Sequence, residues 1–175
     1  MPRNVEIKAR VWDADAMQRR IEEAAGTKGQ LMEQEDVFFP CPNGRLKLRV
    51  FPAGRGELIH YERADTSEAR PSEYRLAPVA APSPLRAVLE AAYGRGVIVR
   101  KRRWLYWAGQ TRMHLDTVEG LGDFVELEVT LTDTQTETDG VVIAEAFAQL
   151  LGIQPGDRVP QAYADLLESG GEEQA

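Results

Sequence analysis

A strict alternation of apolar and charged residues is the feature that most constrains this chain. In the opening stretch "RNVEIKARVW", every second position is apolar, while the positions between them carry Glu6, Lys8 and Arg10. A period of two residues is typical of a β-strand, because successive side chains of a strand point to opposite faces. For this strand alone, a solvent-exposed polar face would explain the charges. The rest of the chain decides between that reading and a charged interior.

Eight segments are predicted to be strands from the same alternation, their β-branched residues and the turn signals that flank them. They span residues 4–11, 30–38, 45–51, 57–64, 71–79, 97–107, 111–118 and 123–132. Short connections and antiparallel neighbours favour a closed barrel, because closure removes the exposed sheet edges. We therefore expect an α+β fold, a closed eight-stranded antiparallel β-barrel with flanking helices.

Four helices are predicted between and after these strands. The first spans 13–26, with Asp13 as N-cap and a closing glycine, and the second spans 83–94, with Ser83 as N-cap. The third and fourth are expected at 137–151 and 160–169. Residues 1–168 are predicted to form a single domain, and residues 169–175 a disordered tail.

Nearly every predicted strand has one apolar face and one ionic face, and the ionic faces carry both signs. In "GRLKLRV", Arg45, Lys47 and Arg49 share a face, and in "FVELEVT" so do Glu126 and Glu128. If these faces pointed outward, the chain would be an ordinary soluble sandwich. In a barrel with an apolar outer wall covered by amphipathic helices, they would instead line a charged tunnel. Buried charges are costly unless they are paired or liganded, so such a tunnel would bind a polyanion and its metal counter-ions.

Overall charge and composition restrict the partners of the protein. The net charge of −7 argues against a general affinity for nucleic acid or anionic lipid. No apolar run approaches the roughly 18–20 residues that span a bilayer, and the polar start does not resemble a signal peptide. The single cysteine, Cys41, excludes an internal disulfide and a cysteine-built metal site. We expect a cytoplasmic monomer or homodimer with no nucleic-acid or membrane partner.

Five motifs between Asn4 and about Leu167 together resemble the CYTH superfamily, the triphosphate tunnel metalloenzymes. They are "VEIK", "QEDVFF", "GRLKLR", "KRR" and "HLDTVEGLGDFVELEV". The last one looks most like the class IV adenylyl cyclase branch of a group that also contains thiamine and inorganic triphosphatases. The resemblance implies an eight-stranded tunnel, in agreement with the strand count, and a small-molecule triphosphate substrate.

The resemblance also assigns roles to individual residues by their position in these motifs. The implied metal ligands are Glu6, Asp116, Glu126 and Glu128. The implied triphosphate-binding residues are Lys8, Arg49, Arg63, Lys101, Arg103 and Arg112, of which Lys8, Arg63, Lys101 and Arg103 are also catalytic candidates. Weaker candidates are Arg10, Arg45, Lys47 and Arg75. Oxygen ligands without cysteine favour Mg²⁺ or Mn²⁺.

Asn4 departs from the E-x-E-x-K pattern of the family's first strand, where the first acid is expected. An amide oxygen can bind a hard cation but adds no charge, so one carboxylate of the implied metal cluster is missing. His114 is expected to face the tunnel, where a structural hydrogen bond to a carboxylate is favoured over a role as general base. His60 is expected on the opposite face of its strand.

Three functions are compatible with these residues. Arg63 stands where thiamine-triphosphatase-like members have a lysine base, and an arginine cannot deprotonate near neutral pH. This favours a cyclase that converts ATP to cyclic AMP and pyrophosphate and leaves activation of the nucleophile to a metal ion. The alternative is hydrolysis of inorganic, nucleoside or thiamine triphosphate. A non-catalytic module that binds polyphosphate or nucleotides is the third hypothesis.

Overall fold

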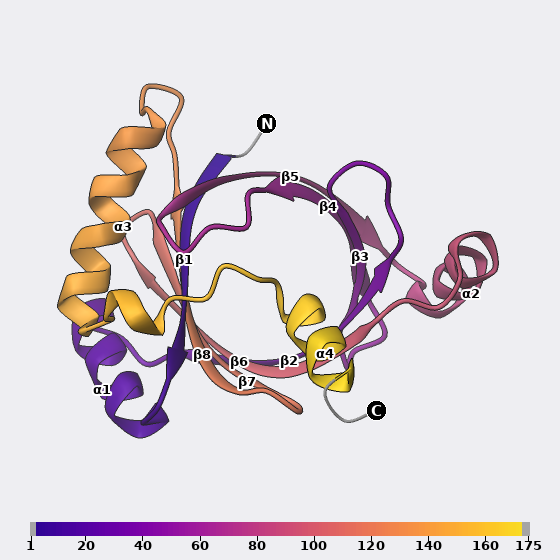
Figure 1. Cartoon of the computed structure of the whole chain (residues 1–175), viewed down its shortest axis with the longest axis horizontal. Helices are drawn as coiled ribbons and strands as arrows, with labels where there is room; N and C mark the ends of the chain where they lie inside the picture. Colours follow the sequence, from indigo (N-terminus) through magenta and orange to yellow (C-terminus); the bar gives the residue numbers. More distant parts are fainter. Residues whose placement is uncertain (1–2, 173–175) are drawn as a thin grey trace.

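Eight antiparallel strands close into a barrel in this computed structural model, which describes residues 3–172. The strands are β1 (Arg3–Val11), β2 (Gln30–Phe39), β3 (Arg45–Val50), β4 (Gly56–Arg63), β5 (Arg70–Val79), β6 (Ile98–Ala108), β7 (Thr111–Val118) and β8 (Gly122–Thr130). Their order around the barrel is β1-β5-β4-β3-β2-β6-β7-β8, and β8 pairs with β1 to close it (Figure 1). The predicted closed barrel is confirmed, and every strand lies within two residues of its predicted bounds.

Four α-helices accompany the barrel, together with a short 3-10 helix at Pro155–Asp157. They are α1 (Ala14–Ala25), α2 (Pro82–Tyr93), α3 (Glu137–Leu151) and α4 (Tyr163–Glu172). The predicted N-cap of the first helix is confirmed, because the Asp13 carboxylate accepts a hydrogen bond from Ala16 N at 2.9 Å. The predicted Ser83 cap is wrong. Helix α2 begins at Pro82, whose ring suits a first helical position, and Ala81 is its N-cap.

Helix α4 differs from its prediction at both ends. It begins at Tyr163, three residues later than predicted, and extends to Glu172, so part of the predicted C-terminal tail is helical. The rest of that tail, residues 173–175, lies outside the described residues. Among the residues that the structure describes, no helix is both long and apolar enough to span a bilayer.

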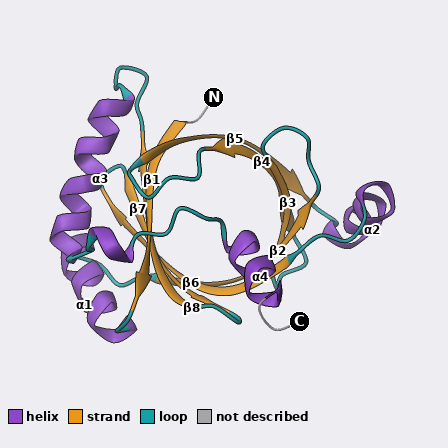
Figure 2. Cartoon of the chain, in the orientation of Figure 1, coloured by secondary structure: helices purple, strands orange, loops and turns teal. Residues whose placement is uncertain are grey.

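Helices cover the outside of the barrel on two sides (Figure 2). Helices α1 and α3 cover the outer surface around β1, β7 and β8, where Ile7 and Leu127 are fully buried. Gly140 lets α3 approach β1 closely, because a Cβ at this position would lie 2.6 Å from Val5. Helix α2 covers β2 and β3 on the other side.

The predicted apolar outer wall is confirmed only where these helices pack. Several outer positions of β4 and β5 carry polar side chains, among them Glu62 and Glu73, which are exposed. These strands need no apolar outer face, because one face of an antiparallel strand can contact water. The side of the barrel that binds no helix therefore presents acidic side chains to water on its outer face.

Candidate active site

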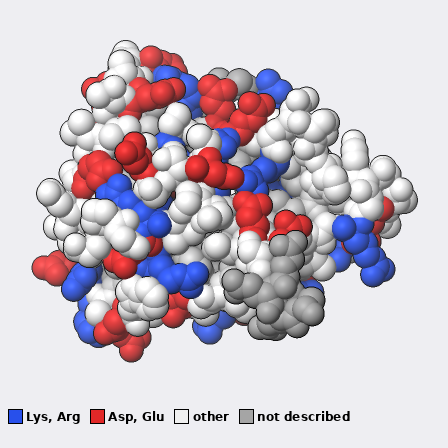
Figure 3. Space-filling view, viewed as in Figure 1, with Lys and Arg blue, Asp and Glu red and all other residues white. Residues whose placement is uncertain are grey.

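A cavity of about 310 Å³ runs inside the barrel, and all eight strands contribute alternate residues to its wall. The predicted site residues that line it are Glu6, Lys8, Arg49, Arg63, Lys101, Arg103, Arg112, Glu126 and Glu128. Closure of the barrel turns the ionic face of each strand inward. On the molecular face seen in Figure 3, acidic and basic side chains are mixed, so the tunnel cations are not part of an extended basic surface there.

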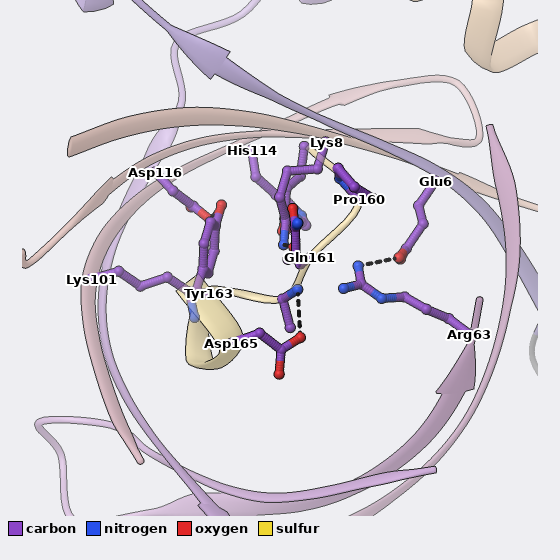
Figure 4. A network of polar contacts seen from close by, with 12 residues as sticks. Glu6, Lys8, Arg63, Lys101, His114, Asp116, Pro160, Gln161, Tyr163 and Asp165 are labelled. Carbon is purple, nitrogen blue, oxygen red and sulfur yellow. Dashed lines mark hydrogen bonds and ion pairs between the residues drawn. The ribbon is translucent and has the colours of Figure 1, made fainter. Parts of the chain in front are cut away.

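One end of the tunnel, termed the blocked end, is crossed by residues 160–163, which lead into α4 and contribute Ala162 and Tyr163 to the cavity wall. Lys8 Nζ donates to the carbonyl oxygen of Gln161 at 3.2 Å, and Arg70 Nη1 donates to that of Pro160 at 2.9 Å. Figure 4 shows this segment crossing the barrel interior, with Tyr163 beside Lys8 and Lys101. Two buried cations thus fasten the segment to the barrel wall by its backbone.

Tyr163 packs against the barrel wall at this blocked end (Figure 4). Its hydroxyl donates to Asp116 Oδ2 at 2.9 Å, and its ring packs edge-on against Phe124, with 5.0 Å between ring centroids. Lys8 Nζ lies 4.0 Å from the centroid of the same ring, an arrangement in which a cation is attracted to the aromatic face. Tyr163 was not among the predicted site residues, because nothing in its local sequence shows that α4 starts inside a barrel.

His114, Glu126 and Glu128 form a group that could hold a metal ion. One ligand atom from each lies within 4.8 Å of the others, on neighbouring positions of β7 and β8. His114 Nδ1 is buried without a hydrogen-bond partner and lies 3.5 Å from a Glu126 oxygen, too far for the predicted structural hydrogen bond. An orphaned nitrogen beside two carboxylates suits a divalent cation, so these residues fit the metal that the tunnel implies.

The charges around this group keep both carboxylates ionised. Burial favours the protonated form of Glu126, but Lys8 and Arg103 outweigh it and hold the pKa of Glu126 well below its ordinary value. Lys8 Nζ lies 3.3 Å from Glu126 Oε1, and Arg103 Nη2 lies 2.8 Å from Oε2. Burial also opposes ionisation of Glu128, and His114 and Arg112 lower its pKa in spite of it.

The other two predicted metal ligands are engaged elsewhere. Glu6 Oε1 accepts from Arg63 Nη1 at 2.8 Å and lies 3.5 Å from Arg70 Nε. Asp116 has no exposed surface. It accepts from Arg103 through both oxygens, at 2.7 and 2.6 Å. The structure therefore brings Glu126 and Glu128 together with His114, and it uses Asp116 to hold Arg103.

A second ionic cluster lies on β3, β2 and β6, next to the strands of the metal group, and its central carboxylate, Asp36, was not predicted. Asp36 on β2 accepts from Lys47 and Arg49 on β3 and from Lys101 on β6. Burial lowers the pKa of Lys101 to about 7, although Asp36 raises it, and burial lowers the pKa of Lys8 to about 8, although Glu126 raises it. Asp36 shares the inward face of β2 with Gln34, and this alternation is the signal that could have identified it.

Residues 2–163 match the CYTH domain family. The chain belongs to the CYTH family. CYTH proteins bind triphosphate substrates, and the family is metal-dependent. No curated protein sequence matches the chain.

Solved structures share this fold over almost the whole chain. A Pyrococcus horikoshii protein, PH1012, is 28% identical with a TM-score of 0.82, and the match covers 93% of this chain and 98% of that one. A "putative adenylate cyclase" from Vibrio parahaemolyticus is 23% identical with a TM-score of 0.74, covering 94% and 97%. A "putative adenylyl cyclase" from Hippeastrum, described as having a dominant triphosphatase activity, is 17% identical with a TM-score of 0.65, covering 97% and 96%.

Asn4, which the sequence resemblance places at the first acid of the motif, lies inside the tunnel. Asn4 is 3% exposed and lines the cavity. In the amide orientation that satisfies both neighbours, its nitrogen donates to Arg3 O and its oxygen accepts from Arg112 Nη2, each at 3.2 Å. Arg112 in turn lies 2.6 Å from Glu128. Arg112 thus links Asn4 to Glu128 of the candidate metal group.

The weaker CYTH candidates do not share one location. Lys47 lines the cavity, whereas Arg45 lies near the blocked end and pairs with Asp165 and Asp65. Arg10 donates to the carbonyl oxygen of Leu121. Two further residues lie on the outer face: Arg75, whose neighbours Tyr74 and Leu76 line the cavity, and His60, its cross-strand partner. The prediction that Arg75 contacts the phosphates is therefore wrong, and His60 lies on the predicted face.

Proposed function

We propose that this protein is a divalent-metal-dependent phosphoryl-transfer enzyme that acts on a triphosphate bound in the barrel tunnel. The observation that carries the proposal is the convergence of cations from several strands on a cavity that also holds a carboxylate–histidine group. A site built only to bind anions gains nothing from two carboxylates gathered beside each other on its wall, as Glu126 and Glu128 are, because they repel the ligand. This argues against the non-catalytic binding module.

The arginine and lysine residues of the tunnel would contact the phosphates in different ways. Arginine forks bind phosphate oxygens bidentately, whereas lysine acts as a point charge. Arg103 is fixed by Asp116 and Glu126, so its orientation is set before a substrate arrives. The remaining phosphate-binding residues of the proposal are Lys8, Arg49, Arg63, Lys101 and Arg112. Fixed positive charges near the transferred group are most of what phosphoryl transfer requires.

His114, Glu126 and Glu128 would hold the metal ion, most simply Mg²⁺ or Mn²⁺. When bound, the ion would offset phosphate charge and favour the ionised form of an attacking hydroxyl. Glu6 and Asp116 stay proposed ligands that would first have to release Arg63 and Arg103. Lys101 and Lys8, whose pKa values are about 7 and 8, can exchange a proton at Nζ near neutral pH.

The unblocked end of the tunnel supports a substrate with an organic group. Its wall carries Leu76, Leu105 and Trp107, which lie on β5 and β6 far from the blocked end. Trp107 is 51% exposed and Leu76 is 45% exposed. Exposed apolar side chains at the mouth of a cavity are typical of a ligand-binding surface. Inorganic triphosphate would leave this apolar rim without a partner.

Between the two reactions, Arg63 favours cyclisation of ATP. It is held by Glu6, and although burial favours its neutral form, Glu6 raises its pKa further, so it cannot act as a base. In a cyclase, the substrate's own 3′-hydroxyl attacks the α-phosphorus and pyrophosphate leaves, so no bound water is needed. The second candidate is hydrolysis, which the dominant triphosphatase activity of the Hippeastrum relative favours.

Product analysis separates these reactions. The pure protein is incubated with ATP, inorganic triphosphate and thiamine triphosphate under Mg²⁺ and Mn²⁺. Cyclic AMP and pyrophosphate from ATP would support the cyclase, and orthophosphate from any substrate would support the triphosphatase. Absence of turnover with all three, despite binding, would contradict the enzyme and favour the binding module.

A further inference from the structure

Three cations on the tunnel wall converge on one buried carboxylate. Asp36 is 1% exposed. Its Oδ1 accepts from Arg49 Nε at 2.8 Å. Its Oδ2 accepts from Arg49 Nη2 at 2.8 Å, Lys101 Nζ at 2.9 Å and Lys47 Nζ at 3.1 Å. Asp36 and Arg49 are direct cross-strand partners of β2 and β3, and Lys101 approaches from β6 on the other side.

Charged groups of both signs surround this cluster: Glu57 on β4, the cross-strand partner of Arg49, lines the same cavity and raises the pKa of that arginine. Arg103 lies two residues along β6 from Lys101, and its charge acts on the lysine. The Tyr163 ring at the start of α4 lies 5.9 Å from Lys101 Nζ. Gln34, the inward neighbour of Asp36 on β2, has a buried Oε1 without a hydrogen-bond partner. Asp36 is thus the anion around which the cations of this wall are arranged.

We propose that Asp36 is a positioning residue for the triphosphate: it holds Lys47, Arg49 and Lys101 as one cluster whose remaining N–H donors face the cavity. This inference rests on the proposed function. Each lysine has three donors and arginine has five, so Asp36 occupies only a minority of them. Below pH 7, where Lys101 is mostly protonated, three cations and one carboxylate retain two positive charges, enough to attract a phosphate that never touches Asp36.

A rival reading is that Asp36 simply competes with phosphate for these cations. The two readings differ in what the charge of Asp36 does to Lys101. Burial lowers the pKa of Lys101 to about 7, and Asp36 is the strongest influence that raises it, whereas Arg49, Arg103 and Lys47 lower it. Without the carboxylate charge, Lys101 would lose its proton at neutral pH and the cluster would lose a cation. A mere competitor would instead leave a stronger phosphate site when removed.

The test uses Asp36→Asn and inorganic tripolyphosphate, with binding measured by calorimetry in EDTA from pH 5.5 to 9. We expect the affinity at pH 8 to fall at least about tenfold and to recover at acid pH. The midpoint of the pH profile should move to lower pH by about 1–3 units, the usual effect of a neighbouring opposite charge. Glu35→Gln is the matched control, because this adjacent carboxylate faces outward and pairs with Arg86 and Arg100. Its profile should equal that of the wild type.

Several outcomes would overturn the inference. Tighter binding by Asp36→Asn at every pH would identify Asp36 as a competitor. A lower melting temperature with an unshifted pH profile would make its role purely structural. If Asp36→Asn does not fold, Asp36→Glu replaces it: we expect an unshifted midpoint with weaker binding, and wild-type affinity would contradict positioning. Failure of the wild type to bind tripolyphosphate both in EDTA and with Mn²⁺ would overturn the proposed function together with this inference, whereas binding only with Mn²⁺ would overturn this inference alone.

Discussion

The tunnel lysines predict that the metal-free protein becomes more stable as the pH rises from 7 to 9. Lys101 has its pKa lowered to about 7 by burial, and Lys8 to about 8, against an ordinary value of 10.5. Between these values the unfolded chain holds protons that the folded protein has released. Because stability rises with pH wherever the unfolded state binds more protons, folding is favoured increasingly across this window. Below pH 7 both states are protonated and the slope disappears.

The magnitude follows from the positions of the two pKa values. One pKa unit corresponds to about 1.4 kcal/mol. From pH 7 to 9, Lys101 then contributes about 2 kcal/mol and Lys8 about 1.4 kcal/mol to the free energy of unfolding. The range ends at pH 9 because burial and Asp116 raise the pKa of Tyr163 well above 10. At higher pH, Tyr163 ionises in the unfolded chain before it ionises in the folded protein. This residue then makes the free energy of unfolding fall as the pH rises.

Urea unfolding followed by circular dichroism at pH 7 and pH 9 in EDTA measures this difference. The wild type should gain about 2–4 kcal/mol, and Lys101→Met should lose roughly half of that gain. Lys28→Met is the matched control, because its side chain is 86% exposed and pairs only with Glu22 at the surface. Its gain should equal that of the wild type. A wild-type stability that is flat or falls between pH 7 and 9 would refute the reasoning, as would an unchanged gain in Lys101→Met.

Three further predictions concern the metal group and the blocked end. Glu126→Gln and Glu128→Gln should each lower kcat about 100-fold or more and weaken Mn²⁺ binding; unchanged turnover and Mn²⁺ affinity in both would remove the metal role of β8. Asn4→Glu should tighten Mn²⁺ binding without substrate and lower the melting temperature without metal, because like charges repel; equal Mn²⁺ affinity would place this position outside the coordination shell. Tyr163→Phe should lower the free energy of unfolding at pH 7 by about 1–3 kcal/mol, since Asp116 loses a buried donor; wild-type stability by urea titration would contradict this.

The barrel itself could be predicted from the sequence because its signal is local. A period of two residues assigns each side chain to a face within its own strand, and eight such strands with short connections leave few alternatives to closure. The alternation also placed Arg49, Lys101 and Glu126 on the tunnel face. Helix α1 could be delimited for the same reason, because Asp13 caps its own helix. The Ser83 cap failed because Pro82 competes for the start of α2.

Only the tertiary structure decided which charged side chains pair with one another. Asp116 lies on the same face of β7 as His114. It accepts hydrogen bonds from Arg103 and Tyr163, however, and lies outside the candidate metal group. Asp36 was missed for the same reason, since one strand does not show which cations its neighbours bring. Alternation is a property of a single strand, whereas pairing depends on register between strands. The contact from Tyr163, 47 residues beyond Asp116 in the chain, depends on where α4 reaches the closed barrel.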